Sequence, residues 1–335
     1  MVGRHNSQKG LVLVATLVMI VLLAAIVVEF FYNSRMELHL ARNVSQGIQA
    51  LEVADGGLTL AMQALSQEAW EDQSPDMVGR LSGQIPVAIG SGTCRIRLVQ
   101  ESGKLNVNSL VDDAGHLNRI QVDRCLQMID LYNRAAQETS ADPVSYAVVA
   151  AIIDWIDPDD KVTVLPWVEG ANKGAESRTY LDRVPAYQCK NGPIEVLSEL
   201  LYVRGVTPEL LYGWVDTQTG ERVPGLQTGL STYGSETLNI NVASSWVLQS
   251  LVPGISERLA HEIIQHRPYQ RLQELQAVPG MSEAIYKRLS HCVDTTSEVP
   301  YFCIQSRARV GDIQRDVSLL VKREGQTVVP VMRWE

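Results

Sequence analysis

The stretch LVLVATLVMIVLLAAIVV, residues 11–28, is apolar at every position except Thr16. As an α-helix it would be about 27 Å long, close to the roughly 30 Å hydrocarbon core of a bilayer. A short polar leader with Arg4 and Lys9 precedes it, and positive charge holds that end of a membrane helix in the cytoplasm. The sequence therefore predicts a single membrane span, with the bulk of the chain on the opposite side of the membrane.

The leader, residues 1–10, admits three interpretations. A cleaved secretory signal needs a shorter apolar core and a small-x-small cleavage site, for which Ala24-Ala25 is a poor candidate. A plain membrane anchor accounts for the apolar stretch equally well. A prepilin-type leader ends in a glycine that follows a basic residue and directly precedes an apolar helix, which would place the cleavage between Gly10 and Leu11.

Beyond the membrane stretch, apolar residues continue at a spacing of three or four, which predicts an amphipathic helix. A bend is expected at Gly56-Gly57, because glycine costs about 1 kcal/mol inside a helix. A long helix that lies half in lipid and half on a domain is the arrangement of a pilin, and the alternative is an anchor followed by an ordinary amphipathic helix. The apolar positions are Met36, Leu40, Val44, Ile48, Leu51, Leu58, Met62 and Leu65.

Strand patterns occur at two distant places in the chain. Residues alternate over Cys94–Gln100, and β-rich runs follow much later at Tyr301–Val310, Val317–Arg323 and Thr327–Trp334. The stretch Val107–Asp294 between them is mostly helical in pattern. We therefore expect an α+β protein, with a large helical domain inserted into a small antiparallel sheet.

Sequence repeats occur inside the helical stretch. Three segments share a glycine that can end one helix and a Ser or Thr that can cap the next. A second sequence similarity, between Leu105–Asn108 and Leu238–Asn241, suggests two related helical subdomains. The three segments are Val203–Leu210, Val252–Leu259 and Val278–Ile285, of which the last two predict a helix-hairpin-helix pair.

Hairpins of this type often hold DNA phosphates through backbone N–H groups. Residues 251–294, however, carry five basic and five acidic side chains, on a chain with a net charge of −9. Hairpins that serve only for packing are therefore favoured. A membrane-anchored, periplasmic DNA-binding protein of an uptake machine is the alternative.

An acidic run follows one of the predicted helices. Carboxylates at the end of a helix oppose its dipole and repel one another, and a bound hard cation such as calcium would relieve both effects. The following loop could close such a site through Glu169, Glu176 and Asp182, although the spacing is not that of an EF-hand. A solvated acidic loop is the alternative. The run consists of Asp154, Asp157, Asp159 and Asp160.

The composition is 45% hydrophobic and 20% charged, which excludes a mostly disordered chain. The sequence contains none of the common catalytic signatures, such as GxSxG, HExxH, a P-loop or the Rossmann glycine pattern. The five cysteines include no CxxC pair, and the six histidines are scattered. The sequence therefore favours a protein that is not an enzyme.

As an ordered set, these features make the chain similar to the minor pseudopilin K family of the bacterial type II (general) secretion system. The resemblance begins with Lys9-Gly10 and continues through Gly103–Asn108 and the acidic run. It then takes in Gly174-Ala175-Glu176 and ends with Leu238–Ser244 and the paired hairpins. It covers nearly the whole chain, and the set is far more specific than any of its parts.

The resemblance implies a pilin-like core with a large inserted α-domain of two SAM-like subdomains. It implies a non-enzymatic subunit at the tip of a periplasmic pseudopilus, which helps to initiate assembly and to support export of folded proteins across the outer membrane. The expected partners are minor pseudopilins I and J, other pseudopilins, the prepilin peptidase and inner-membrane lipid, with no nucleic acid. Bound calcium is also implied, and the matching positions are Asp157, Asp159, Asp160 and Glu176.

The resemblance also bears on the cysteines and on the division of the chain into parts. Most of the chain would lie in the oxidising periplasm, where cysteines can form disulfides. Cys94 and Cys303 both fall on predicted core strands, so this pair is the expected disulfide. The expected parts are the leader 1–10, the membrane helix 11–28, its periplasmic continuation 29–66, the first part of the core 67–104, the α subdomains 105–215 and 216–294, and the C-terminal strands 295–335.

Overall fold

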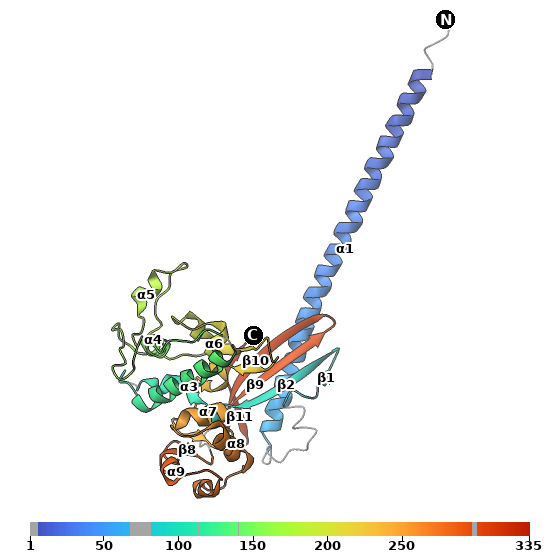
Figure 1. Ribbon diagram of the computed structural model, residues 1–335. Coiled ribbons are helices and arrows are strands. Elements are labelled where there is room, and N and C mark those ends of the chain that lie inside the picture. Colours follow the sequence, from blue (N-terminus) through green and yellow to red (C-terminus); the bar gives the residue numbers. More distant parts are fainter. Residues whose placement is uncertain (1–5, 68–81, 113, 140, 297–299) are drawn as a thin grey trace. The chain divides into compact units, whose positions relative to one another are not determined.

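The computed structural model describes residues 6–67, 82–112, 114–139, 141–296 and 300–335. The α+β fold predicted from the sequence is confirmed: a long N-terminal helix, a sheet and a large helical insert (Figure 1). The chain forms two compact units, and each is described separately. Unit 1 consists of Met1–Leu98, Ile304–Leu319 and Met332–Glu335, and unit 2 consists of Val99–Cys303 and Leu320–Val331.

The first helix, α1 (Asn6–Leu65), is continuous through both the membrane stretch and the amphipathic stretch. The helix is not interrupted at Asp55-Gly56-Gly57, where a bend was predicted, and it packs closely on the sheet at this level. A Cβ atom at Gly57 would lie 2.4 Å from Ser306 Oγ and 3.0 Å from Cys94 Sγ. The glycine therefore permits a close approach instead of interrupting the helix. The buried residues of this part of α1 include Ala50, Val53, Ala54, Leu58, Ala61 and Leu65.

The sheet has five strands, and the long insert separates its second strand from its third in the chain. The strand order is β1-β2-β9-β10-β11, and β1 and β2 are antiparallel. Buried residues alternate with exposed ones along β2 and β9, as expected of strands with one covered face. The strands are β1 (Val87–Ile89), β2 (Gly92–Gln100), β9 (Tyr301–Val310), β10 (Ile313–Glu324) and β11 (Thr327–Trp334).

The predicted Cys94–Cys303 disulfide is wrong, since none of the five cysteines forms a disulfide. A Cβ atom at Gly57 would meet both Ser306 Oγ and Cys94 Sγ, so these two side chains lie on the same face of the sheet, towards α1. Successive residues of a strand point to opposite faces. Cys303 is three positions from Ser306 and therefore lies on the opposite face. The sequence predicted both strands but not this relationship between their faces.

The insert consists of short helices and small two-stranded pieces, and it contains a large cluster of buried hydrophobic residues between Leu105 and Val293. Its first half contains β3 (Leu105–Asn106), η3 (Val107–Leu110), α3 (Arg119–Glu138), α4 (Ala147–Ile156), α5 (Ser177–Leu181), η4 (Leu197–Tyr202) and α6 (Pro208–Tyr212). It then continues through β4 (Gly213–Val215), β5 (Arg222–Pro224), η5 (Leu226–Thr228) and β6 (Leu230–Ser231). The second half contains β7 (Leu238–Asn239), α7 (Ser245–Leu251), α8 (Glu257–Gln265), η6 (Leu272–Ala277), α9 (Glu283–Leu289) and β8 (Val293–Asp294). One short element, η2 (Glu101–Gly103), precedes the insert.

Two asparagines make equivalent hydrogen bonds in the two halves of the insert. Asn108 Oδ1 accepts the N–H of Ile194, and its amide group donates to the Ile194 carbonyl. Asn241 makes the same pair of bonds with Tyr269. Each asparagine follows a short strand that pairs in parallel with the strand closing its half, β3 with β6 and β7 with β8. The sequence similarity between Leu105–Asn108 and Leu238–Asn241 thus corresponds to a repeated structural feature.

Candidate metal centre

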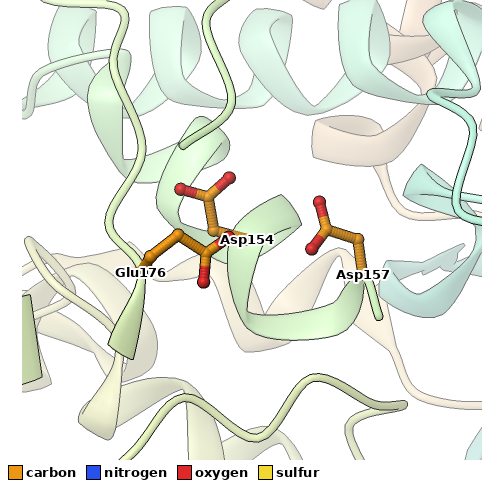
Figure 2. A group of neighbouring side chains, drawn as sticks. All are labelled: Asp154, Asp157 and Glu176. Atoms are coloured by element: carbon orange, nitrogen blue, oxygen red, sulfur yellow. The ribbon is translucent and has the colours of Figure 1, made fainter. Parts of the chain in front are cut away.

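Three carboxylates meet where α4 ends. Asp154 lies in the last turn of α4, Asp157 is the residue that caps its C-terminus, and Glu176 directly precedes α5. Each offers an oxygen atom, and these atoms all lie within 4.8 Å of one another (Figure 2). Asp154 and Asp157 are three residues apart, so they share one side of the helix end. Glu176 is brought to them by the return of the chain after the loop.

The three side chains are almost completely buried, with exposed fractions of 0% for Asp154, 6% for Asp157 and 4% for Glu176. Asp154 Oδ1 accepts the backbone N–H of Thr163 at 2.8 Å. Four other oxygens have no hydrogen-bond partner among the residues that the structure describes: Asp154 Oδ2, Asp157 Oδ1 and both oxygens of Glu176. Buried carboxylates without partners are costly, because the charged form loses its hydration.

This environment raises the pKa of all three groups. Burial is the main cause for Asp157, whose pKa rises to about 7, and the charges of Asp154 and Asp159 add to it. Burial likewise raises the pKa of Glu176 to about 8, with further contributions from Asp154 and Asp157. The pKa of Asp154 is also raised by burial, although its bonds to Thr163 oppose the shift. The cluster therefore favours uptake of positive charge, as protons or as a cation.

The backbone beside the cluster is held close to it. A Cβ atom at Gly174 would lie 2.1 Å from Asp154 Oδ2 and 2.6 Å from the carbonyl oxygen of Ala150. The N–H of Gly174 donates to the Thr163 carbonyl at 2.9 Å, and its own carbonyl accepts a bond from Arg204 at 2.8 Å. The segment before Glu176 is thus fixed against α4 at a position that only glycine can occupy without displacement.

The structure brings together two of the four predicted calcium ligands. Asp157 and Glu176 lie in the cluster, whereas Asp159 and Asp160 are exposed and outside it. Asp159 instead accepts the backbone N–H of Lys161 at 2.7 Å and pairs with the Lys161 ammonium at 3.3 Å. The other two residues considered for closing the site, Glu169 and Asp182, are also exposed.

Asp154 belonged to the predicted acidic run but not to the predicted ligand set, and it is the most buried member of the cluster. Its three-residue spacing from Asp157, at the end of an apolar helix, was the available signal. The cluster offers oxygen atoms only. The nearby Cys189 thiol donates to the Asp154 carbonyl at 3.1 Å and is not a member of the group. Hard cations such as calcium or magnesium prefer a donor set of this kind.

The predicted helix-hairpin-helix pair is present, with the predicted caps. Ser256 Oγ accepts the N–H of Leu259 at 3.2 Å at the start of α8, and Ser282 makes the corresponding bond at α9. Of the basic residues, Arg267 is turned inward. It donates to the Ala243 carbonyl at 2.6 Å, and burial lowers its pKa to about 10. This guanidinium group therefore serves packing, and no observation favours DNA binding.

The membrane stretch is the second functional feature. The most apolar 18-residue window of α1 has a mean hydropathy of 2.9, and none of it is buried against the rest of the chain. Exposed apolar residues continue beyond the membrane stretch, to Val44 and Ile48. By its length and composition this helix can cross a bilayer. The predicted cleavage position, between Gly10 and Leu11, lies near its beginning.

Comparison with known proteins finds a match for a segment of each half of the insert. Residues 103–213 match the family model "Type II secretion system (T2SS), protein K", and residues 234–293 match a helix-hairpin-helix motif. One chain of the crystal structure of the GspK-GspI-GspJ complex from the enterotoxigenic Escherichia coli type 2 secretion system has a similar fold. It aligns with a TM-score of 0.62 and 19% identity, over 88% of this chain and 98% of that one. A search of the curated proteins finds no significant match.

Proposed function

Through residues 103–213 the chain belongs to the protein K family of the type II secretion system, and on this premise we propose that it initiates and caps a pseudopilus. It would do so as a minor pseudopilin at the tip, together with minor pseudopilins I and J, and would thereby support export of folded proteins across the outer membrane. One observation carries the proposal. A pilin-like unit with a long uncovered apolar helix is joined to a bulky insert, which is easier to place at the end of a filament than inside it.

Two different surroundings would cover the exposed apolar residues of α1. Inner-membrane lipid would surround residues 12–28, since this part is as long as the hydrocarbon core is thick. Residues beyond it, such as Val44 and Ile48, would pack against the helices of neighbouring pseudopilins. The sheet and the insert would then lie in the periplasm, and the prepilin peptidase would remove the leader between Gly10 and Leu11. The role is one of assembly and not of catalysis.

The carboxylate cluster would bind calcium in this proposal. Asp154, Asp157 and Glu176 supply oxygen donors, and the four buried oxygens without partners are those that a cation would satisfy. A cation there would neutralise the mutual repulsion of the three groups. It would also tie the segment before α5 to the end of α4. We assign the ion a structural role, in which it stabilises the first half of the insert.

The full chain, co-expressed with candidate minor pseudopilins I and J and extracted in detergent, provides the test. We expect the three proteins to co-purify as one complex. A Val44→Ser/Ile48→Ser variant should lose the partners, because it removes exposed apolar contacts of α1. A Glu37→Ser/Arg42→Ser variant changes exposed residues of the same helix region and should retain them. Purification of the chain without either partner would contradict the proposal.

A further inference from the structure

Four arginines are exposed on one face of the sheet in unit 1. Arg95 and Arg97 on β2 alternate with the buried Cys94 and Ile96, and Gly57 of α1 packs on that buried side. On the neighbouring strand β9, Arg307 and Arg309 are likewise exposed and alternate with the buried residues Ser306, Ala308 and Val310. All four arginines therefore lie on the face opposite to α1. We call this set, Arg95, Arg97, Arg307 and Arg309, the arginine face.

The two strands bring the arginines close together. Gly92 on β2 lies beside Arg309 and Val310, whereas Cys94, two residues later, lies together with Ser306 against Gly57 of α1. The strands therefore run in opposite directions, and the exposed residues of β2 lie across from those of β9. Like charges placed opposite each other on neighbouring strands are destabilising. The proximity of the four arginines therefore does not by itself stabilise the sheet, which points to a binding partner outside the chain.

The carboxylates of the described residues do not balance these charges. Arg307 Nε donates to both oxygens of Asp316, at 2.9 and 3.1 Å. Arg309 reaches Asp312 only at 4.0 Å, and the guanidinium of Arg95 bonds to a backbone carbonyl. Arg97 forms no side-chain hydrogen bond or ion pair with the described residues. Among the residues that the structure describes, four guanidinium groups thus face two carboxylates, on a chain whose net charge is −9.

We propose that the arginine face binds a carboxylate-rich surface of an adjacent pseudopilin subunit, an inference that rests on the proposed function. Guanidinium groups match carboxylates in a two-pronged geometry, which suits them to acidic protein surfaces. The arginine face lies too far from the membrane for its charges to interact with lipid headgroups. The turn at Gly311, beside Gln46, lies about 27 Å along α1 from Val28, at 1.5 Å per residue. That separation is several times the roughly 8 Å over which exposed charges interact at physiological ionic strength.

The experiment measures partner retention by the full chain, co-expressed with candidate minor pseudopilins I and J and extracted in detergent. An Arg97→Gln/Arg309→Gln variant removes two charges of the arginine face without touching the Arg307–Asp316 pair. We expect it to bind the partners about tenfold more weakly at low salt, as for loss of complementary charge. The matched control, Arg134→Gln/Arg258→Gln, removes two exposed arginines of unit 2 and should bind like the unaltered chain. Raising the salt concentration should weaken partner binding by the unaltered chain and by the control. It should weaken binding by the arginine-face variant much less.

Equal retention by the arginine-face variant and the control would overturn this inference and leave the proposed function standing. Failure of the unaltered chain to retain any partner, even at low salt, would overturn both. Vesicles of phosphatidylethanolamine and phosphatidylglycerol provide a further arm, in which the purified chain and the variant should associate equally. A selective loss of vesicle binding by the variant, with partner retention unchanged, would assign the face to anionic lipid and overturn the inference. Equal melting temperatures of variant and control exclude misfolding as the cause of a difference.

Discussion

Gly174 lies so close to Asp154 that a Cβ atom on the glycine would be 2.1 Å from the carboxylate oxygen Oδ2. This contact joins the segment before Glu176 to the last turn of α4, and it helps to bury the Asp154 carboxylate. The position of the loop backbone and the geometry of the cluster therefore depend on each other. A change at Gly174 should alter both the stability of the insert and its response to calcium.

We expect Gly174→Ala to destabilise the protein by about 1–3 kcal/mol, because the added methyl group must displace either the carboxylate or the backbone. The stabilisation by calcium should also shrink, since Asp154 would move. Gly192→Ala is the matched control, because its Cβ would meet no atom closer than 3.8 Å. Thermal unfolding of the full chain in detergent, with calcium and with a chelator, measures both effects. Equal melting temperatures for the two variants would contradict the packing described at Gly174.

Removal of a charge from the cluster should have opposite effects with and without the ion. Asp154→Asn reduces the repulsion on Asp157 and Glu176, so the chelated protein should become more stable. The same variant should lose most of the rise in melting temperature that calcium produces in the unaltered chain. Asp159→Asn changes an exposed carboxylate outside the cluster and should leave that rise intact. A larger loss in Asp159→Asn than in Asp154→Asn would show that the ligand set is wrong.

The stability of the chelated protein should fall as the pH rises. Asp157 and Glu176 have ordinary pKa values of 3.8 and 4.5, which in the folded protein rise to about 7 and about 8. The folded state therefore holds protons that the unfolded chain has released. This contribution to stability is complete below about pH 4 and is lost as the pH rises through 7 and 8. Melting temperatures measured from pH 5 to pH 9 should decline with a chelator and decline less with calcium, and a rise in the chelated samples would refute the burial of these groups.

Two glycines of α1 should respond in opposite ways to alanine. Gly57→Ala places a methyl group 2.4 Å from Ser306 Oγ, so we expect a loss of about 1–3 kcal/mol in the stability of unit 1. In Gly47→Ala the added Cβ atom would meet only the flexible end of the Arg315 side chain, at 3.3 Å. Alanine is also favoured over glycine in a helix by about 1 kcal/mol. It should therefore be neutral or stabilising. Unfolding of both variants in detergent measures the difference, and similar destabilisation by the two would speak against the close packing of α1 on the sheet.

The sequence predicted the elements of this fold better than the contacts between them. The apolar stretch at 11–28 and the alternation at Cys94–Gln100 are local patterns, and both gave the observed elements. The packing role of Gly57 was not predicted, because it depends on a sheet that is distant in the sequence. The Cys94–Cys303 pairing failed for the same reason, since only the register shows which face each thiol occupies.

The candidate site was predictable in part. The end of α4 and the acidic run were visible as patterns, and the following loop offered Glu176 as one of three candidates. Resemblance to the protein K family then selected Glu176 from the three. The meeting of Glu176 with Asp157 depends on the path of the intervening loop, which no spacing rule supplies. The same path leaves Asp159 and Asp160 in solvent, although they are neighbours of Asp157 in the sequence. The arginine face was missed, because its members come from strands that are about 200 residues apart in the chain and adjacent only in the sheet.

Export by the source bacterium tests the central claim, that the chain is a minor pseudopilin on which type II secretion depends. Deletion of the gene should leave the exported proteins in the periplasm, and the unaltered chain supplied in trans should restore their release. A Gly10→Val variant, altered at the position proposed for leader removal, should be made but should not restore release. Normal export in the deletion strain, with the exported proteins outside the cell, would contradict the account.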